Sequence, residues 1–230
     1  MKAPTPRSNT DLAYTRNRQT VEGASSYAGK YRSRWHKRLS MYRERALLGK
    51  IFTRLDHSET LLDVPSGPGR LSDIFANACD RFHAVDSSLE MLRILRNLPL
   101  SPDPSSRVFN IQALSVASAF HLPFRDSSFD TVVSVRLSHH IPTAPDRTAH
   151  LVELLRVARR HVIVSFFDSG SLKNRLREFR RALGSGKRAK YTLGRHDVVR
   201  CACNAGFPVH SFWRLAPLVS GHSFAVLSKS

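Results

Sequence analysis

The sequence has few cysteines and no long apolar run. Its 230 residues include three cysteines, Cys79, Cys201 and Cys203, too few for a disulfide framework, which favours a reducing, cytoplasmic setting. No apolar run approaches the roughly 18 residues that a membrane span needs. The opening stretch, MKAPTPRSNT, also lacks the apolar segment of a secretory signal. The sequence therefore predicts a protein with neither a transmembrane segment nor a leader.

Acidic residues are also scarce. There are 18 Asp and Glu against 36 Lys and Arg, which gives a formal net charge of +18. Such an excess attracts anions over long distances, so it favours nucleic acid, an anionic lipid surface or a phosphorylated substrate as partners. A solvated arginine-rich surface, or the composition of the organism's proteome, would give the same count. The apolar fraction of 41% is typical of globular proteins and excludes a wholly disordered chain.

The chain divides into three segments. Residues 1–26 are polar and predict a flexible N-terminal arm. Residues 27–57 predict one or two basic helices, because large apolar residues recur there at roughly helical spacing. These are Tyr31, Trp35, Leu39, Tyr42, Leu47 and Ile51. Residues 58–230 predict the main domain, with a basic helical insertion at about 169–193.

From residue 60 onward, short apolar runs alternate with helical patterns. Strands are predicted at 60–64, 82–86, within 108–116, and at 129–135, 161–167, 208–214 and 222–229. Helices are predicted at 70–79, 87–97, 146–159, 171–183 and 195–205, with Ser87 as the N-cap of the second. This alternation favours parallel strands with right-handed crossovers, and the short last connection favours an antiparallel hairpin. The predicted fold is an α/β, doubly wound, seven-stranded sheet with an antiparallel C-terminal edge.

The segment LLDVPSGPGRL (61–71) carries most of the chemistry. A strand ends at Asp63, and a turn containing Gly67 and Gly69 leads into a helix. Glycines let the backbone approach a ligand closely, and the helix N-terminus offers N–H groups. Asp86 ends the next strand, where it can accept hydrogen bonds from ribose hydroxyls. This arrangement indicates a nucleoside site, although the glycines alone would also suit a plain turn.

The residues also indicate which nucleoside is bound. A dinucleotide fingerprint would place a third glycine where Ser72 stands. Asp63 at the mouth of the loop disfavours a pyrophosphate and tolerates a cation. S-adenosylmethionine fits, because it carries a sulfonium and an ammonium and no phosphate.

The motifs together resemble the class I S-adenosylmethionine-dependent methyltransferases. LDVPSGPGR (62–70) and HAVDSSLEML (83–92) resemble the first two motifs of that family. ASAFHLPFRDSSFDTVVSVRLSHHI (117–141) resembles the later motifs of its small-molecule and quinone-directed branch, the methyltransferase domain 11-like proteins. The resemblance covers roughly residues 58–230 and implies a Rossmann-like fold with S-adenosylmethionine as cofactor.

The resemblance implies that one group of residues holds the methionine end of the cofactor. Asp63, Gly67 and Gly69 match the first motif, and Arg136, just after the fourth strand, would line the same side. The sequence departs from the family at Pro65, where the first glycine commonly stands.

A second group would hold the adenosine end. By resemblance, Asp86 binds the ribose diol, while Ser87 and Met91 lie near the adenine. Ser118 and Ala119 would meet the adenine edge. Ser118 replaces the usual Asp or Asn, so a backbone group would have to bond the adenine amino group.

Candidate catalytic residues follow the fourth strand. The cofactor supplies an activated methyl group, so a base is needed only if the acceptor must lose a proton. Histidine as a residue type titrates near neutral pH, so His139 and His140 are candidate bases, although one of two adjacent histidines could pack or cap the next loop. His121 is a weaker candidate, and Tyr27 and Tyr31 would form part of a lid or pack in the core. The cysteines form no tetrahedral ligand set, so no metal is expected.

Only the basic segments of the sequence give information about the methyl acceptor. The stretch 171–183 combines Lys and Arg with Leu172, Leu176, Phe179 and Leu183 at helical spacing. One interpretation is an enzyme acting on a small or lipid-like acceptor at an anionic membrane surface, cytoplasmic or peripheral at the inner face. A second is an RNA methyltransferase whose basic helices bind phosphates. A third is a non-catalytic module that binds nucleic acid or protein. Motifs 117–141 favour the first.

Overall fold

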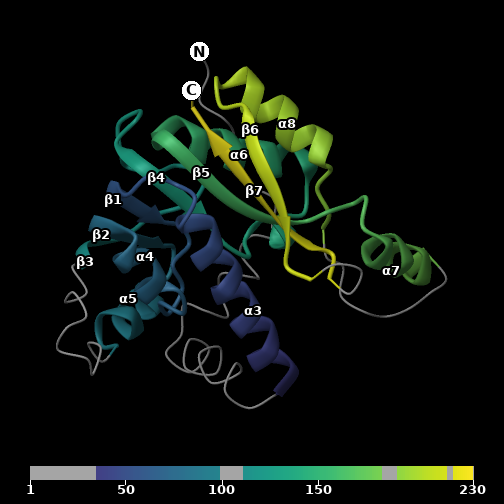
Figure 1. Ribbon diagram of the computed structural model, residues 1–230, viewed down its shortest axis with the longest axis horizontal. Coiled ribbons are helices and arrows are strands. Elements are labelled where there is room, and N and C mark those ends of the chain that lie inside the picture. The colour runs from purple at the N-terminus through teal and green to yellow at the C-terminus, as the bar shows by residue number, and fades with distance from the viewer. Residues whose placement is uncertain (1–34, 99–110, 183–190, 217–219, 230) are drawn as a thin grey trace.

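The computed structural model describes residues 35–98, 111–182, 191–216 and 220–229 (Figure 1). The predicted arm at 1–26, and Tyr27 and Tyr31, lie outside the described residues. Seven strands among the described residues form one sheet: β1 (Ser58–Asp63), β2 (Cys79–Asp86), β3 (Ile111–Val116), β4 (Phe129–Ser134), β5 (Ala158–Phe167), β6 (Val209–Arg214) and β7 (His222–Ser228). The helical elements are α3 (Trp35–Phe52), α4 (Ser72–Asn77), α5 (Leu89–Arg96), η1 (Ser138–His140), α6 (Ala144–Val157), α7 (Leu172–Ala182) and α8 (Arg195–Asn204).

The strand order is β3-β2-β1-β4-β5-β7-β6. The first five strands pair in parallel, and β7 runs antiparallel to both β5 and β6. The predicted doubly wound fold with an antiparallel C-terminal edge is therefore confirmed, with β6 outermost in the antiparallel pair. The chain reverses its direction of winding between β1 and β4, and open α/β sheets bind their ligands at such a switch point.

Helices cover both faces of the sheet, because neighbouring strand residues point to opposite sides. Leu61 and Val133 pack in one core with residues of α3, α4 and α5. Leu62 and Val132 pack in the other with residues of α6 and α8. In contrast, α7 stands apart from both helical layers (Figure 1). No helix among the described residues is both long and apolar enough to cross a membrane.

Several predicted boundaries are shifted in the structure, and three of the shifts have a local physical cause. The N-cap of α5 is Ser88, whose Oγ accepts the Met91 N–H at 3.3 Å, while Ser87 is exposed. Ser88 is fixed there because its own N–H donates to the Asp86 carboxylate at 2.9 Å. Cys79 begins β2 instead of ending a helix, because it pairs with Ser58. The helix predicted at 146–159 ends at Val157, because Ala158 already pairs with β4.

Only part of the apolar spacing predicted for the N-terminal helix lies on its buried face. Leu39 and Tyr42 are exposed, Tyr42 by 70%, whereas the predicted Ile51 is buried. Glu44 and Leu48, which the prediction did not include, share that buried face. Residues at spacings of four and three share one face of a helix, so Glu44 lies on the face that packs against the sheet. A buried charge on that face requires partners, and Arg70 and Arg136 provide them.

Candidate active site

The predicted cofactor residues gather at the carboxyl edge of four neighbouring parallel strands. Asp63 ends β1 and Asp86 ends β2, while the loops after β3 and β4 carry Ser118 and Arg136. A backbone hydrogen bond ties the turn after β1 to the end of β2, since the Ser66 N–H donates to Val85 O at 2.9 Å. This edge includes the switch point between β1 and β4, where a ligand is expected in this fold.

The two glycines of the β1 turn have different surroundings. Gly67 and Gly69 both have a left-handed backbone, with φ of 55° and 77°. A Cβ on Gly67 would meet no atom within 4 Å, so the backbone there borders open space. A Cβ on Gly69 would collide with Leu95 of α5, which gives this glycine a packing role of its own. The open face at Gly67 fits the close approach of a cofactor.

Asp63 and Asp86, at the ends of β1 and β2, form an acidic pair. Asp86 accepts the Gly67 N–H at 2.8 Å, so it shapes the loop while keeping lone pairs for a ligand. Asp63 is buried. Burial and the nearby Asp86 raise the pKa of Asp63 well above its usual value, and Arg70 opposes that rise. A cationic group bound here would stabilise the ionised form of Asp63, so the site suits an ammonium or sulfonium.

The loop predicted to meet the adenine is held by a residue that sequence reasoning missed. His150 of α6 is buried, and its Nδ1 donates to Ala119 O at 3.0 Å. Its Nε2 then accepts from the Ser134 hydroxyl at 3.1 Å. The Ser118 Oγ accepts the Phe120 N–H at 3.3 Å, which closes the same turn. Burial lowers the pKa of His150 to about 4, so this histidine is neutral and structural.

The two candidate bases differ in exposure. His139 is 5% exposed and its ring stacks on Phe167 with 4.4 Å between centroids. His140 is partly exposed, with its ring centroid 4.1 Å from that of His139. His222 of β7, which the sequence did not indicate, lies edge-on to His139 at 6.2 Å. His121 is exposed and lies on the turn after β3, apart from this cluster. Within this cluster, His140 is the most exposed histidine.

A buried carboxylate on α3 is the largest feature that sequence reasoning missed. Glu44 is fully buried, and its Oε1 accepts from Arg136 Nε at 2.8 Å. Its Oε2 accepts from Arg70 Nη1 at 3.2 Å. Burial favours a raised pKa, but Arg136 and Arg70 hold the pKa of Glu44 below its ordinary value. The available signal was that Glu44 is the sole acidic residue between 35 and 52.

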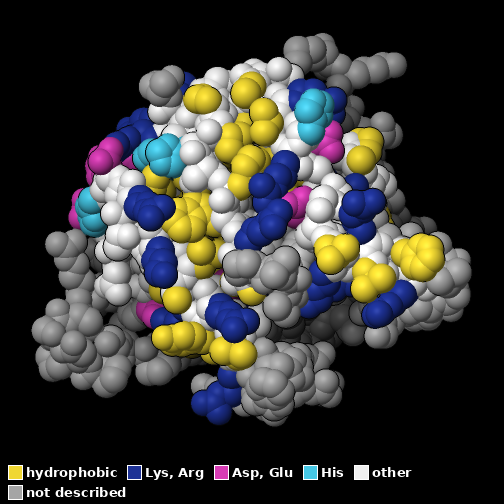
Figure 2. Space-filling model, turned by 45° about the vertical axis from the view of Figure 1, so that its right-hand side comes forward, with side chains coloured by type: hydrophobic (Ala, Val, Ile, Leu, Met, Phe, Trp, Pro, Cys, Tyr) yellow, Lys and Arg dark blue, Asp and Glu magenta, His cyan; other side chains and the backbone are white. Residues whose placement is uncertain are grey.

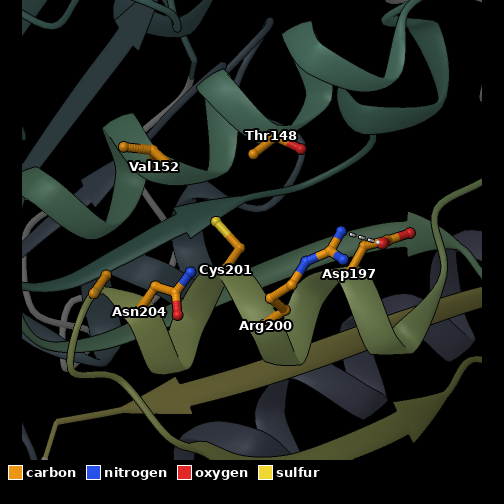
Figure 3. Close-up of a pocket in the computed structure, with 7 residues that line it drawn as sticks. Thr148, Val152, Asp197, Arg200, Cys201 and Asn204 are labelled. Atoms are coloured by element: carbon orange, nitrogen blue, oxygen red, sulfur yellow. Dashed lines mark hydrogen bonds and ion pairs between the residues drawn. The ribbon is translucent and has the colours of Figure 1, made fainter.

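A shallow groove of about 250 Å³ lies elsewhere, between α6 and α8 (Figure 3). Its lining residues are Thr148, Val152, Asp197, Arg200, Cys201, Asn204 and Ala205. None of the predicted cofactor or catalytic residues lines it. Burial raises the pKa of Cys201, which disfavours a reactive thiolate in the groove. In the described part of the chain, no group of three or more His, Cys, Asp or Glu is arranged to hold a metal ion.

Comparisons with known proteins agree with this geometry. Residues 62–166 match the family described as "Methyltransferase domain", and no curated protein matches the chain by sequence. Similar solved structures include magnesium protoporphyrin IX methyltransferase from Synechocystis PCC 6803 with bound S-adenosylhomocysteine, with a TM-score of 0.77, 16% identity and coverage of 96% of this chain and 100% of that one.

Two further structures share the fold. The N-methyltransferase NodS from Bradyrhizobium japonicum WM9 has a TM-score of 0.64 and 11% identity, covering 96% of this chain and 99% of that one. A methyltransferase from Haloferax volcanii, solved in complex with the Trm112 activator, has a TM-score of 0.63 and 15% identity, covering 89% and 94%. Residues 62–166 therefore match a methyltransferase domain, and the fold of the chain is that of solved methyltransferases, one of them with bound S-adenosylhomocysteine.

Proposed function

We propose that this enzyme transfers the methyl group of S-adenosylmethionine to a small or lipid-like acceptor at an anionic membrane surface, such as the inner face of a membrane. The observation that carries the proposal is the surface of α7. Leu172, Leu176 and Phe179 are 72%, 45% and 62% exposed. Their spacing of four and three residues puts them in one stripe along the helix.

Basic residues flank this apolar stripe. Lys173, Arg175 and Arg180 are exposed on the same helix. Figure 2 shows apolar and basic side chains together on the side of the molecule where α7 lies. An exposed apolar stripe beside cations suits the boundary of an anionic bilayer, where each basic residue near the surface contributes about 1 kcal/mol. A helix that bound only RNA phosphates would gain nothing from the apolar residues.

The position of α7 supports an acceptor that comes from that surface. The helix begins at Leu172, five residues after β5 ends at Phe167. Because β5 is parallel to β4, both strands end at the edge that carries the cofactor residues. Asn174 fixes the start of α7 by donating to Asp168 O at 2.9 Å and to Gly221 O at 3.0 Å. In this proposal, residues 58–230 form the catalytic domain, and the segment 169–193 within it binds the membrane surface.

The proposed cofactor site assigns roles to residues at the strand ends. The cofactor supplies a methyl group on a sulfonium, which needs no further activation. Asp63 and the open backbone at Gly67 would face the methionine end, with Arg136 on the same side, and Asp86 would hold the ribose. The pocket for the adenine would be completed by Met91, Ser118 and Ala119.

His140 is proposed to face the acceptor. It lies after β4, and its ring is supported by the His139–Phe167 stack. A neutral imidazole there would accept a proton from a hydroxyl or amino acceptor as the methyl group is transferred. The magnesium protoporphyrin IX methyltransferase of the same fold, which is named for a small-molecule acceptor, supports this acceptor class.

Label transfer tests the proposed function. The purified chain is incubated with methyl-labelled S-adenosylmethionine, a cell extract and vesicles of phosphatidylglycerol and phosphatidylcholine, and the lipid, RNA, protein and small-molecule fractions are separated. We expect label in the organic-soluble fraction and more of it with phosphatidylglycerol than with phosphatidylcholine alone.

Other outcomes would overturn the proposal. Label in RNA, lost steeply as salt rises, would make the basic helices phosphate-binding elements. Cofactor binding without label in any fraction would favour a non-catalytic binding module. For the base, His140→Ala should reduce turnover while leaving cofactor affinity unchanged, and unchanged turnover would remove His140 from the reaction.

A further inference from the structure

Glu44 joins three parts of the chain that are far apart in sequence. It lies on α3, Arg70 follows the glycine turn after β1, and Arg136 follows β4. The Glu44 carboxylate contacts both arginines, at 2.8 Å and 3.2 Å. The two loops that flank the switch point are therefore held by one side chain from outside the matched methyltransferase domain.

The backbone at Arg136 shows why this contact matters. Arg136 has φ of 64°, a left-handed conformation that is unfavourable for a residue with a side chain. Its N–H donates to the buried Ser165 Oγ at 2.7 Å, which holds the backbone. Glu44 and Ser40 of α3 then fix the guanidinium, with Ser40 Oγ at 3.4 Å from Nη2. Such strain persists only where surrounding contacts enforce it, and it is common at functional sites.

A second residue of α3 secures the same turn. Arg45 donates to Arg70 O at 3.0 Å and forms an ion pair with Asp73 of α4. Glu44 and Arg45 thus hold both the side chain and the backbone of Arg70. Since Arg70 opposes the raised pKa of Asp63, the position of α3 also affects the charge at the cofactor edge.

We infer that Glu44 is a positioning residue for methyl transfer: by holding Arg136 and Arg70, it sets the geometry that binds the amino-acid end of S-adenosylmethionine. The inference rests on the proposed placement of that end at Arg136 and Asp63. It makes the N-terminal helix a part of the cofactor site, although Glu44 itself need not touch the cofactor.

The test compares two ligands on one variant. S-adenosylhomocysteine carries the amino-acid end, whereas methylthioadenosine keeps only the adenosine and a short thioether. We expect Glu44→Gln to weaken S-adenosylhomocysteine binding at least tenfold and methylthioadenosine binding less than twofold, measured by calorimetry. Glu44→Asp, which keeps the charge and protects folding but is one methylene shorter, should show a smaller effect of the same kind. In turnover, KM for S-adenosylmethionine should rise more than kcat falls.

Asp130→Asn is the matched control. Asp130 is also a buried carboxylate paired with an arginine, since its Oδ1 accepts from Arg159 Nε at 2.8 Å. It lies near the start of β4, at the opposite edge of the sheet, and should lose stability without losing affinity for either ligand.

The outcomes separate the inference from the proposed site. Equal weakening of both ligands by Glu44→Gln, or unchanged affinity for S-adenosylhomocysteine, would overturn the positioning role. No binding of S-adenosylhomocysteine by the wild type would refute the proposed cofactor site and the inference with it.

Discussion

The helices α3 and α7 are both rich in Lys and Arg, but α3 packs against the sheet whereas α7 stands apart from both helical layers (Figure 1). In α3, Leu39 and Tyr42 face solvent while Glu44 is fully buried between two arginines. In α7, Leu172 and Phe179 face solvent while Asn174 is 1% exposed. In each helix a buried polar side chain fixes the position of the helix, whereas apolar side chains at helical spacing are left outside.

The comparison shows that the basic residues behind the net charge of +18 have different surroundings in different parts of the protein. Arg70 and Arg136 pair with the buried Glu44, and Arg45 pairs with the partly exposed Asp73, so these ion pairs link α3 to α4 and to the loops after β1 and β4. On α7, Arg175 and Arg180 are exposed beside apolar residues. The first group holds the loops after β1 and β4, and the second stays exposed on the surface, where the proposed anionic partner would bind.

The largest effect is expected from removing the anchor of α3. Glu44→Ala would leave two arginines without their buried carboxylate, and breaking such a pair costs about 3–5 kcal/mol. Urea denaturation should show this loss in the free energy of unfolding. Tyr42→Ala on the exposed face of the same helix is the control and should change it by less than about 0.5 kcal/mol. A loss of similar size in both variants would contradict the assigned buried face.

The comparison extends to α6, whose contribution to the stability of the fold depends on pH. In α6, His150 is the buried polar anchor, and its pKa is lowered to about 4 from a usual 6.5. Between these values the unfolded chain takes up a proton and the folded chain does not. Stability is therefore full above pH 6.5 and falls as pH drops towards 4, by about 3 kcal/mol.

The His150 prediction is checked by denaturation at several pH values. His150→Gln should be less stable than the wild type near pH 7 but should lose less stability between pH 6.5 and 4. If the two pH slopes are the same, His150 does not carry this dependence, and His83 and His161, whose pKa values burial also lowers, would have to account for it.

The exposed stripe of α7 should govern membrane binding and not stability. Replacing Leu172, Leu176 and Phe179 with Ser removes apolar surface worth about 1 kcal/mol or more per residue at an interface. We expect sedimentation with phosphatidylglycerol vesicles to weaken by roughly 100-fold. The melting temperature should remain within a few degrees, and a large fall in it would show that the stripe packs against the protein.

The smallest effect is expected from replacing Asn174, the buried residue that fixes the start of α7. Asn174→Ala removes two hydrogen bonds to the carbonyl groups of Asp168 and Gly221, which costs about 1–3 kcal/mol. Hydrogen exchange should increase in α7 and leave α3 unchanged. Faster exchange in both helices would mean that they unfold as one unit, which would weaken the contrast between them.

Several parts of the proposed site could be predicted from the sequence because their signals are local. Asp63, Gly67 and Asp86 follow apolar strands, and the turn chemistry around them is contained within a few residues. The cap of α5 was displaced by one residue, to Ser88, because Asp86 binds the Ser88 N–H across the turn. Likewise, β5 begins at Ala158 because its pairing with β4 outweighs the helical pattern.

The sequence by itself determined the alternation of strands and helices, the motif order and the two carboxylates that end β1 and β2, since periodicity and turn chemistry act over short distances. Only the tertiary structure decided which face of α3 is buried, that α7 leaves its apolar stripe exposed, that His150 holds the loop after β3, and that His222 lies against His139. The physical reason is that a charged or hydrogen-bonding group pairs with groups that are close to it in space, whatever their separation in the chain. Glu44 and Arg136 are 92 residues apart in the chain, and no periodicity connects them.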